Sequence, residues 1–395
     1  MIEIKLNDLQ NEEIVIYGAG VYGEIAYNGL KYLGIKPKVF CDRYTAGEKY
    51  FDIEVIDFDM LKEKYKDHLI FIASAPYFSE IRLILEENCF KNIASIEKLM
   101  KLPIPNEWLS SKALEKMNNF ELYAEAVKAS EYRDKLFFNH LEVVITERCN
   151  LRCKDCANLM QFYMNPENLD ICEIEKALNR LLQIVSRISE LRILGGEPFV
   201  NVQIADIVNK YCFNEKIGKI VIYTNGTVVA SDKILSQLSN KKVEVHISDY
   251  NVSNSKIVLL EKKMQEFNIK YYVRQYERWN RLGNLKLREF DEERLRTMFL
   301  NCVMANCYSL YRGKLYRCPR AAHGQQLGAF HNLKWEQIDL LDEENSDESI
   351  FIEIQKMMKE KKPLTACRYC NGSNWHESGV PAAVQVDHVC FLDEE

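Results

Sequence analysis

The sequence lacks the features that would direct the protein to a membrane, to export or to a nucleic acid. No run of about eighteen apolar residues occurs in the 395-residue chain, and the first five residues show no signal-peptide pattern. There is no excess of positive charge either, since 52 Lys and Arg residues stand against 58 Asp and Glu residues and give a net charge of -6. We therefore expect a cytoplasmic protein with neither nucleic acid nor membrane as a partner.

Cysteine is the residue type that stands out in the composition. The chain has 13 cysteines; its 395 residues are enough for roughly two or three domains, and its 47% hydrophobic residues support real cores. In an exported protein so many cysteines would suggest disulfides, but in a reducing cytosol the clustered ones indicate metal ligands. The spacing of the cysteines is therefore the first guide to function.

Three cysteines, Cys149, Cys153 and Cys156, follow the strand-like segment 141–146 in a C-x3-C-x2-C pattern. A zinc knuckle that lacks one ligand and a set of buried thiols are the alternatives. Zinc sites usually close with four ligands, and no His or Cys lies between Cys156 and Cys172. The spacing favours a [4Fe-4S] cluster held by three thiolates, with one iron open to a ligand that is not protein.

This cysteine loop resembles that of radical S-adenosylmethionine (radical SAM) enzymes, in which the methionine of the cofactor chelates the open iron and reductive cleavage yields a 5′-deoxyadenosyl radical. The segment Gly195-Gly196-Glu197-Pro198, after the expected strand 191–194, matches the GGEP element that in this family binds the methionyl amino group. An ordinary turn after a strand would need only the two glycines. The resemblance covers residues 139–375 and implies a [4Fe-4S] cluster and S-adenosylmethionine as cofactors.

Further cofactor contacts are expected at the ends of the next two strands, where polar side chains can reach the ribose of the cofactor: Thr224, Asn225, Ser248 and Asp249. Turn formation and helix capping explain these residues equally well. The chain departs from the family before the third cysteine, where Asp155 stands in place of an aromatic residue that is often near the adenine. Phe162 and Tyr163 are the candidates to replace that aromatic ring.

The expected fold class is α/β. Strands alternate with helices after residue 138, which indicates an open or partial parallel barrel, and the resemblance implies a partial (β/α)6 barrel. The strands are expected at 141–146, 191–194, 219–223, 243–247 and 270–273, and the sixth is not placed. The expected domains are a Rossmann-like domain at 1–100, a helical linker at 101–138, the radical SAM barrel at 139–290 and a small α+β auxiliary-cluster extension at 291–395.

The N-terminal segment has the pattern of a small doubly wound sheet. A strand at 14–17 is followed by Gly18, Gly20 and Gly23, then by a helix, a second strand and Asp42. Such glycines allow a phosphate to approach a helix N-terminus, and an acid about 20 residues further on can bind a ribose hydroxyl. A tight crossover needs the same glycines without any ligand, so a nucleotide site is one of two interpretations. In pattern, the segment resembles the Rossmann-like domains attached to sugar-modifying enzymes.

A second set of cysteines lies near the C-terminus. The pattern Cys302-x10-Gly313-x4-Cys318 resembles the opening of the SPASM/Twitch extension, and Cys367 and Cys370 can complete four ligands of an auxiliary [4Fe-4S] cluster. Gly313 suits a hairpin turn. Two separated cysteine pairs also make a zinc ribbon, which is the alternative. Cys307 is the alternative ligand to Cys302.

These observations predict an enzyme. The expected reaction is hydrogen abstraction from a sugar or nucleotide-linked small molecule, leading to carbinol oxidation, with an external electron donor such as flavodoxin or ferredoxin. Redox-neutral epimerisation is the alternative, with Cys307 or Cys390 as candidate thiol hydrogen donors. A ribosomal peptide maturase and a noncatalytic electron-transfer protein are the remaining alternatives.

Overall fold

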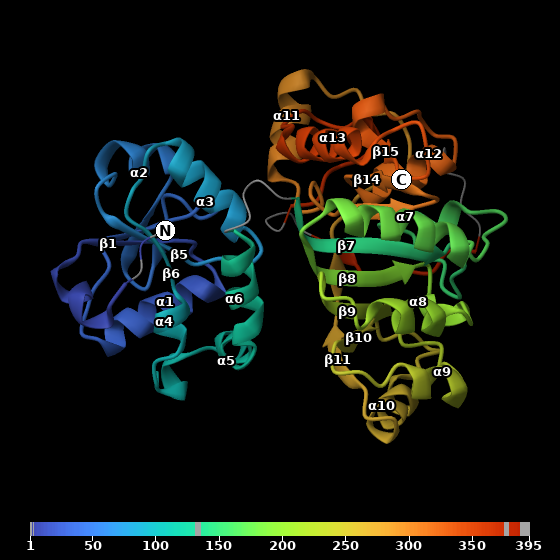
Figure 1. The fold of residues 1–395 in the computed structure, drawn as a ribbon, viewed down its shortest axis with the longest axis horizontal. Helices are drawn as coiled ribbons and strands as arrows, with labels where there is room; N and C mark the ends of the chain where they lie inside the picture. The colour runs from blue at the N-terminus through green and yellow to red at the C-terminus, as the bar shows by residue number, and fades with distance from the viewer. Residues whose placement is uncertain (1, 3, 131–135, 375–378, 388–395) are drawn as a thin grey trace. The chain divides into compact units, whose positions relative to one another are not determined.

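The computed structural model describes residues 2, 4–130, 136–374 and 379–387, and it divides the chain into two compact units (Figure 1). The first unit comprises Met1–Asp134 and the second Lys135–Glu395. The α/β fold class expected from the sequence is confirmed in both units, because each is built on a largely parallel sheet flanked by helices. None of the described helices combines the length and the apolar character needed to cross a bilayer. Cys390 lies outside the described residues.

The first unit contains a six-stranded sheet in the order β3-β4-β2-β1-β5-β6. All neighbouring strands are parallel except β3, which pairs antiparallel with β4. The strands are β1 (Ile14–Tyr17), β2 (Val39–Cys41), β3 (Lys49–Tyr50), β4 (Ile53–Ile56), β5 (Leu69–Ile72) and β6 (Ile93–Ser95). Because helices cover the parallel strands, β1 and β5 are almost wholly buried and apolar. The covering helices are α1 (Val21–Tyr32), α2 (Phe58–Lys64), α3 (Phe78–Glu87) and α4 (Glu97–Met100).

Two further helices, α5 (Ser111–Asn118) and α6 (Phe120–Ala129), lie where a linker is expected. They belong to the first unit, because their apolar faces join its core through buried Ala113 and Tyr123. The Tyr123 hydroxyl donates to the carbonyl of Ile72 at the end of β5 and accepts from a backbone N–H in the core. The first unit therefore extends beyond the predicted boundary at residue 100.

The second unit contains an eight-stranded sheet in the order β11-β10-β9-β8-β7-β13-β14-β15 (Figure 1). Strands β7 to β11 are parallel neighbours in chain order, at the positions that the sequence predicted. They are β7 (Phe137–Thr146), β8 (Arg187–Gly195), β9 (Ile217–Thr224), β10 (Val243–Asp249) and β11 (Lys270–Gln275). The sixth parallel strand in the described sheet is β13 (Ser309–Tyr311), which comes from beyond the predicted barrel and pairs with β7.

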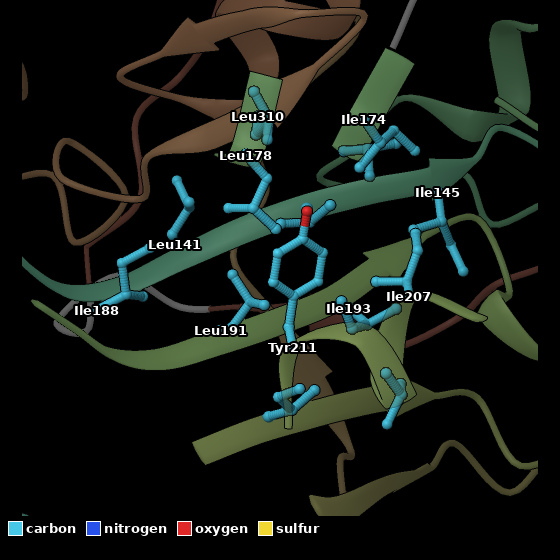
Figure 2. Close-up of a cluster of buried hydrophobic side chains, with 14 of the residues drawn as sticks. Leu141, Ile145, Ile174, Leu178, Ile188, Leu191, Ile193, Ile207, Tyr211 and Leu310 are labelled. Atoms are coloured by element: carbon cyan, nitrogen blue, oxygen red, sulfur yellow. The ribbon is translucent and has the colours of Figure 1, made fainter. Parts of the chain in front are cut away.

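The two faces of this sheet differ in character because successive strand residues point to opposite sides. On one face, Leu141 and Ile145 of β7 and Leu191 and Ile193 of β8 pack against the helices (Figure 2). These helices are α7 (Ile171–Ile184), α8 (Ile204–Tyr211), α9 (Asp232–Gln237) and α10 (Ile257–Glu266). The opposite face, here called the inner face, carries polar side chains on all five strands: His140, Glu142, Glu190, Arg192, Lys219, Tyr223, Glu244, His246, Lys270 and Tyr272.

The C-terminal part continues the same unit. Strands β14 (Lys314–Tyr316) and β15 (Gln337–Asp339) extend the sheet antiparallel beyond β13. The helices of this part are α11 (Glu292–Asn301), α12 (Pro319–Gln326) and α13 (Asp347–Lys359). A separate pair of short strands is formed by β12 (Arg278–Trp279) and β16 (Val380–Pro381). A small core joins Leu159 and Phe162, just after the cysteine loop, to Phe299 and Phe330. The cysteine loop and the C-terminal extension are therefore packed together.

Candidate active site

The cysteine loop begins where β7 ends, and its three thiols are gathered together. A negative charge on the Cys156 sulfur would oppose ionisation of both Cys149 and Cys153. The three sulfur atoms therefore lie close enough to interact electrostatically. Burial raises the pKa of Cys153 to about 11, and the neighbouring Cys156 thiol adds to this shift. Backbone N–H groups at residues 158 to 160 donate toward Cys156. The loop thus presents three converging sulfur ligands.

The donor set fits an iron–sulfur cluster. Three soft thiols that are wholly or partly buried beside one another stay neutral unless a cation favours their thiolates, and iron would supply that charge. Close packing around Cys149 supports the same conclusion. A Cβ atom at Gly196 would lie 2.2 Å from the carbonyl oxygen of Arg148 and 3.0 Å from the Cβ of Cys149. Only glycine at this position lets the end of β8 lie against the cysteine loop.

The Gly195–Pro198 segment is held directly against the start of the cysteine loop. The Gly196 N–H donates to the carbonyl of Thr146 over 2.9 Å, and the Glu197 N–H donates to the carbonyl of Arg148 over 2.8 Å. Gly195 has a φ of +142°, and a Cβ there would lie 2.1 Å from the Thr146 carbonyl oxygen. Both glycines are therefore required by backbone geometry and by close approach of two chain segments.

Glu197 is fully buried and organises the end of β9. Its carboxylate accepts from the Thr224 hydroxyl over 2.8 Å, from the Asn225 N–H over 2.8 Å and from the Phe199 N–H over 3.1 Å. Burial raises the pKa of Glu197 to about 7, although these three hydrogen bonds favour the ionised form. A carboxylate offers about four acceptor positions, so the three protein bonds leave room for one more donor.

Asn225 connects this carboxylate to the cysteine loop. Its side-chain amide donates to the Asn150 side chain over 3.2 Å and lies 3.7 Å from the Cys149 sulfur. Ser248 and Asp249, at the end of β10, lie farther along the same edge. Ser248 bonds the Tyr250 hydroxyl, whereas the Asp249 side chain accepts from the Asn251 N–H over 2.9 Å, as a turn-forming residue does. Thr224 and Asn225 are thus brought to the cysteine loop, and Asp249 is engaged in a local turn.

The two aromatic residues considered as replacements near an adenine are engaged elsewhere. Phe162 belongs to the small apolar core beside the extension. The Tyr163 hydroxyl lies 2.7 Å from Nδ1 of His323 and 3.1 Å from the Tyr311 hydroxyl, inside a buried polar network. Both side chains are buried, and their role as replacements for the aromatic ring near the adenine stays a prediction.

The four cysteines predicted for an auxiliary cluster also converge. Cys302 follows α11, Cys318 precedes α12, and Cys367 and Cys370 belong to a short turn of helix at Thr365–Tyr369 and its end. The charges of Cys302, Cys318 and Cys370 all oppose ionisation of Cys367, and burial with its neighbours raises the pKa of Cys318 to about 12. The turn at Gly313, with a φ of +70°, brings β14 back beside β13 as predicted.

Cys307 is placed differently from these four. Its thiol lies with His140 and Glu142, where one ligand atom from each residue falls within 4.8 Å of the others. Glu142 is also the first charged neighbour that opposes ionisation of Cys307, ahead of Cys318 and Cys302. The structure therefore groups Cys302 with the other three auxiliary cysteines and groups Cys307 with the inner face of the sheet.

Residues 143–283 match the family model of the radical SAM superfamily. This matched segment is a radical SAM domain. Cofactors of this family are a [4Fe-4S] cluster and S-adenosylmethionine, in agreement with the prediction from the cysteine loop. The matched segment begins within β7 and ends past β12, so it contains both the cysteine loop and the Gly195–Pro198 segment.

Similar curated proteins match the chain over part of their length. A GTP 3′,8-cyclase of Clostridium acetobutylicum is 32% identical over 111 residues, which are 28% of this chain and 34% of that protein. Molybdenum cofactor biosynthesis protein 1 of Bos taurus is 31% identical over 121 residues, which are 30% of this chain and 18% of that protein. The chain thus spans about a third or less of these relatives.

Solved structures that match part of the chain include BtrN in complex with AdoMet and 2-DOIA, at 15% identity and a TM-score of 0.38, covering 60% of this chain and 94% of that one. Streptococcus suis SuiB is 20% identical with a TM-score of 0.29, covering 51% of this chain and 44% of that one.

Some residues at the radical SAM domain could not be found from sequence spacing. Gln385 donates to the Cys153 sulfur over 3.1 Å and is separated from it by more than half the chain. Tyr250, beside the same thiols, packs edge-on against Trp279 with ring centroids 5.0 Å apart. A signal for Tyr250 was available, because it directly follows the predicted polar pair at the end of a strand. Gln385 has no such signal.

The glycine turn in the first unit is explained largely by packing. A Cβ at Gly18 would lie 2.6 Å from the Ala73 carbonyl oxygen, and one at Gly23 would lie 2.2 Å from the Gly18 carbonyl oxygen. Asp42 accepts from the Ala19 N–H over 2.9 Å, so one of its oxygens binds the turn itself. Gly20 differs, because a Cβ added there would have no described atom within 4 Å. The nucleotide site at Gly18, Gly20, Gly23 and Asp42 stays a prediction.

Proposed function

We propose that the protein is a radical SAM enzyme that removes a hydrogen atom from a small polar substrate, with carbinol oxidation as the outcome. A sugar or a nucleotide-linked sugar is the favoured substrate class. The observation that carries the polar substrate is the inner face of the barrel sheet, where every parallel strand from β7 to β11 contributes a polar side chain. A nucleotide-linked substrate gains support from the relatives named GTP 3′,8-cyclase.

The reaction begins at the cysteine loop. Cys149, Cys153 and Cys156 are the proposed ligands of the [4Fe-4S] cluster, which with S-adenosylmethionine supplies a 5′-deoxyadenosyl radical when an electron arrives from a donor such as flavodoxin or ferredoxin. Gly196 lets the end of β8 approach this loop. Glu197 then fixes Asn225 beside Cys149 through the Asn225 N–H. These residues hold the cofactor in place at the ends of the strands.

The inner face provides donors and acceptors for hydroxyl groups. Glu190 binds the Tyr223 hydroxyl over 3.2 Å and pairs with Arg192 and Lys219. Glu244 continues the row through its ion pairs with Lys219 and Lys270 of the same face. Burial alone would raise the pKa of Glu190, but the charges of Arg192 and Lys219 outweigh it and lower that pKa to about 2. A polyhydroxylated substrate can hydrogen-bond to such fixed charged groups.

The four converging cysteines support oxidation rather than a redox-neutral outcome. Cys302, Cys318, Cys367 and Cys370 are the proposed ligands of an auxiliary [4Fe-4S] cluster, which would supply an electron acceptor. A carbinol that loses its carbon-bound hydrogen atom must also lose one electron and one proton to become a carbonyl. The placement of the Cys307 thiol with His140 and Glu142 is the observation that favours this set over one containing Cys307.

The test begins with anaerobic purification and cluster reconstitution. Iron should approach about eight per chain, as two cubane clusters require. With dithionite and S-adenosylmethionine, the protein should form 5′-deoxyadenosine, and the triple variant Cys149→Ala, Cys153→Ala, Cys156→Ala should form none. If the triple variant kept this activity, the proposed mechanism would be refuted.

Substrate class is tested by incubation with panels of sugars, nucleotide sugars and GTP, followed by mass spectrometry. Carbinol oxidation removes two hydrogens, so the product should be about 2 Da lighter, and a substrate deuterated at the reacting carbon should transfer its label to 5′-deoxyadenosine. An unchanged mass with label exchange would instead indicate epimerisation. A cyclised product from GTP alone would contradict the sugar assignment.

A further inference from the structure

A compact set of potential ligands lies on the inner face at a distance from the cysteine loop along β7. His140 and Glu142 are two residues apart on β7, so their side chains point to the same face. Cys307 reaches them from the segment just before β13, which pairs with β7 so that Ser309 lies opposite Glu142. One ligand atom from each of the three residues lies within 4.8 Å of the other two.

Glu142 is buried, His140 and Cys307 are partly buried, and one ring nitrogen of His140 has no hydrogen-bond partner among the described residues. Nε2 of His140 is inaccessible to solvent and has no partner among the described residues. Glu142 is 8% exposed, and its carboxylate accepts from the Ser309 hydroxyl over 2.9 Å. The Cys307 thiol has only a long contact of 3.9 Å to the carbonyl of Val303. Buried polar groups are normally paired, so an orphan imidazole beside a carboxylate and a thiol needs an explanation.

We propose that His140, Glu142 and Cys307 bind one divalent metal ion, for which Zn²⁺ is the best match. Zinc accepts imidazole nitrogen, carboxylate oxygen and thiolate sulfur together, and three protein ligands are typical of sites that keep a fourth position open. A neutral imidazole, a carboxylate and a thiolate together offset the two positive charges of the ion, which suits a buried location. The sulfur ligand makes Mg²⁺ and Ca²⁺ poor candidates.

The surroundings support such a site. Ser309 orients the Glu142 carboxylate, and its hydroxyl also lies 3.4 Å from the Cys307 carbonyl oxygen, so one residue steadies two ligands. Arg192 is the nearby positive charge that would oppose a cation. It is engaged with Glu190 on its own strand and lies over the Tyr223 ring, 5.4 Å from the ring centroid, so its charge is largely offset.

The site goes beyond the proposed function, because it needs neither the cofactor nor the auxiliary cysteines. The open fourth position would lie on the polar inner face, where a substrate hydroxyl or a water can bind the ion. This placement assigns Cys307 to the metal, in place of a role as auxiliary-cluster ligand or as hydrogen donor.

The experiment measures zinc and iron in the same anaerobically reconstituted protein. After incubation with stoichiometric Zn²⁺ and desalting, the wild-type chain should retain about one zinc, and X-ray absorption at the zinc edge should show one sulfur among nitrogen and oxygen ligands. His140→Gln and Glu142→Gln should each lower zinc retention at least about tenfold, in line with the loss of a ligand, while iron stays at the wild-type level. Cys172→Ser, which removes an exposed thiol on α7, is the matched control and should keep the zinc.

Three results would overturn the site. Retention of less than about a tenth of a zinc per chain would show that the three residues hold no metal. Unchanged zinc in both His140→Gln and Glu142→Gln would place the ion elsewhere, and loss of zinc in Cys302→Ser would place it among the auxiliary cysteines. That last outcome would refute the auxiliary iron cluster as well, whereas wild-type iron content with no zinc would refute the zinc site alone.

Discussion

Gly196→Ala tests whether the radical SAM domain depends on the close approach of β8 to the cysteine loop. In the folded chain, the added methyl group would lie 2.2 Å from the carbonyl oxygen of Arg148 and 2.5 Å from its carbonyl carbon. Both atoms belong to backbone, so no flexible side chain can move aside. The Arg148–Cys149 peptide must shift, and with it the sulfur of Cys149.

The magnitude follows from the cost of overpacking. Forcing one extra methyl group into a packed site typically costs about 1 to 3 kcal/mol. If the strain falls on the loop that holds the cofactor, binding of S-adenosylmethionine should weaken by about 5- to 150-fold. The hydrogen bonds from the Gly196 and Glu197 N–H groups would lengthen at the same time, which places the effect at the upper end of this range.

The assay is anaerobic titration with S-adenosylmethionine, together with the rate of 5′-deoxyadenosine formation at saturating dithionite. Gly20→Ala is the steric control, because no described atom lies within 4 Å of its Cβ position, and it should bind the cofactor as the wild-type chain does. Iron content separates loss of the cluster from loss of cofactor binding. Wild-type affinity in Gly196→Ala would refute the argument that this contact shapes the site.

Three further predictions concern the second unit. Cys302→Ser should lose about four irons per chain while Cys307→Ser loses none, as measured by iron analysis after reconstitution; equal losses would contradict the grouping of the cysteines. Burial lowers the pKa of His323 to about 3 from an ordinary value of 6.5. As the pH falls, the unfolded chain therefore takes up a proton at this histidine before the folded chain does. The free energy of unfolding should fall below pH 6.5 by about 1.4 kcal/mol per pH unit. His323→Gln should flatten this loss in denaturant unfolding at about pH 7.5 and 5.5, and an unchanged slope would exclude His323 as its source. Tyr311→Phe removes the donor to buried Glu147 and should lower the free energy of unfolding by about 1 to 3 kcal/mol, whereas unchanged unfolding would show that water or another group replaces it.

The parts of the site that the sequence predicted are those set by short spacing at the end of one strand. The cysteine loop after β7 and the Gly195–Pro198 segment after β8 belong to this class, because chemistry in parallel barrels gathers at the carboxyl ends of strands. The turn at Gly313 is also local, since a residue with positive φ is required there. In each case the residues that act together are close in sequence or occupy equivalent strand ends.

The parts that were not predicted depend on pairing between distant segments. The sixth parallel strand, β13, joins the sheet beside β7 rather than after β11, and no local pattern specifies that neighbour. The same pairing brings Cys307 to His140 and Glu142, which share no motif with it. Gln385 reaches Cys153 by an equally distant contact. Such contacts form only when the whole chain is packed, so the spacing of these residues in the sequence does not reveal that they lie close together.

One buried network links the cysteine loop to the C-terminal extension and explains why the two form a single unit. Glu147, two residues before Cys149, accepts from the Tyr311 hydroxyl and from Arg312, both in the β13–β14 hairpin. The Tyr311 hydroxyl also bonds Tyr163, which continues to His323 on α12. Because a buried carboxylate that lacks donors is costly, the hairpin stabilises Glu147 in its place, in addition to the Glu167 N–H that donates to it over 3.2 Å. Docking of the extension therefore sets the position of the chain that leads into Cys149.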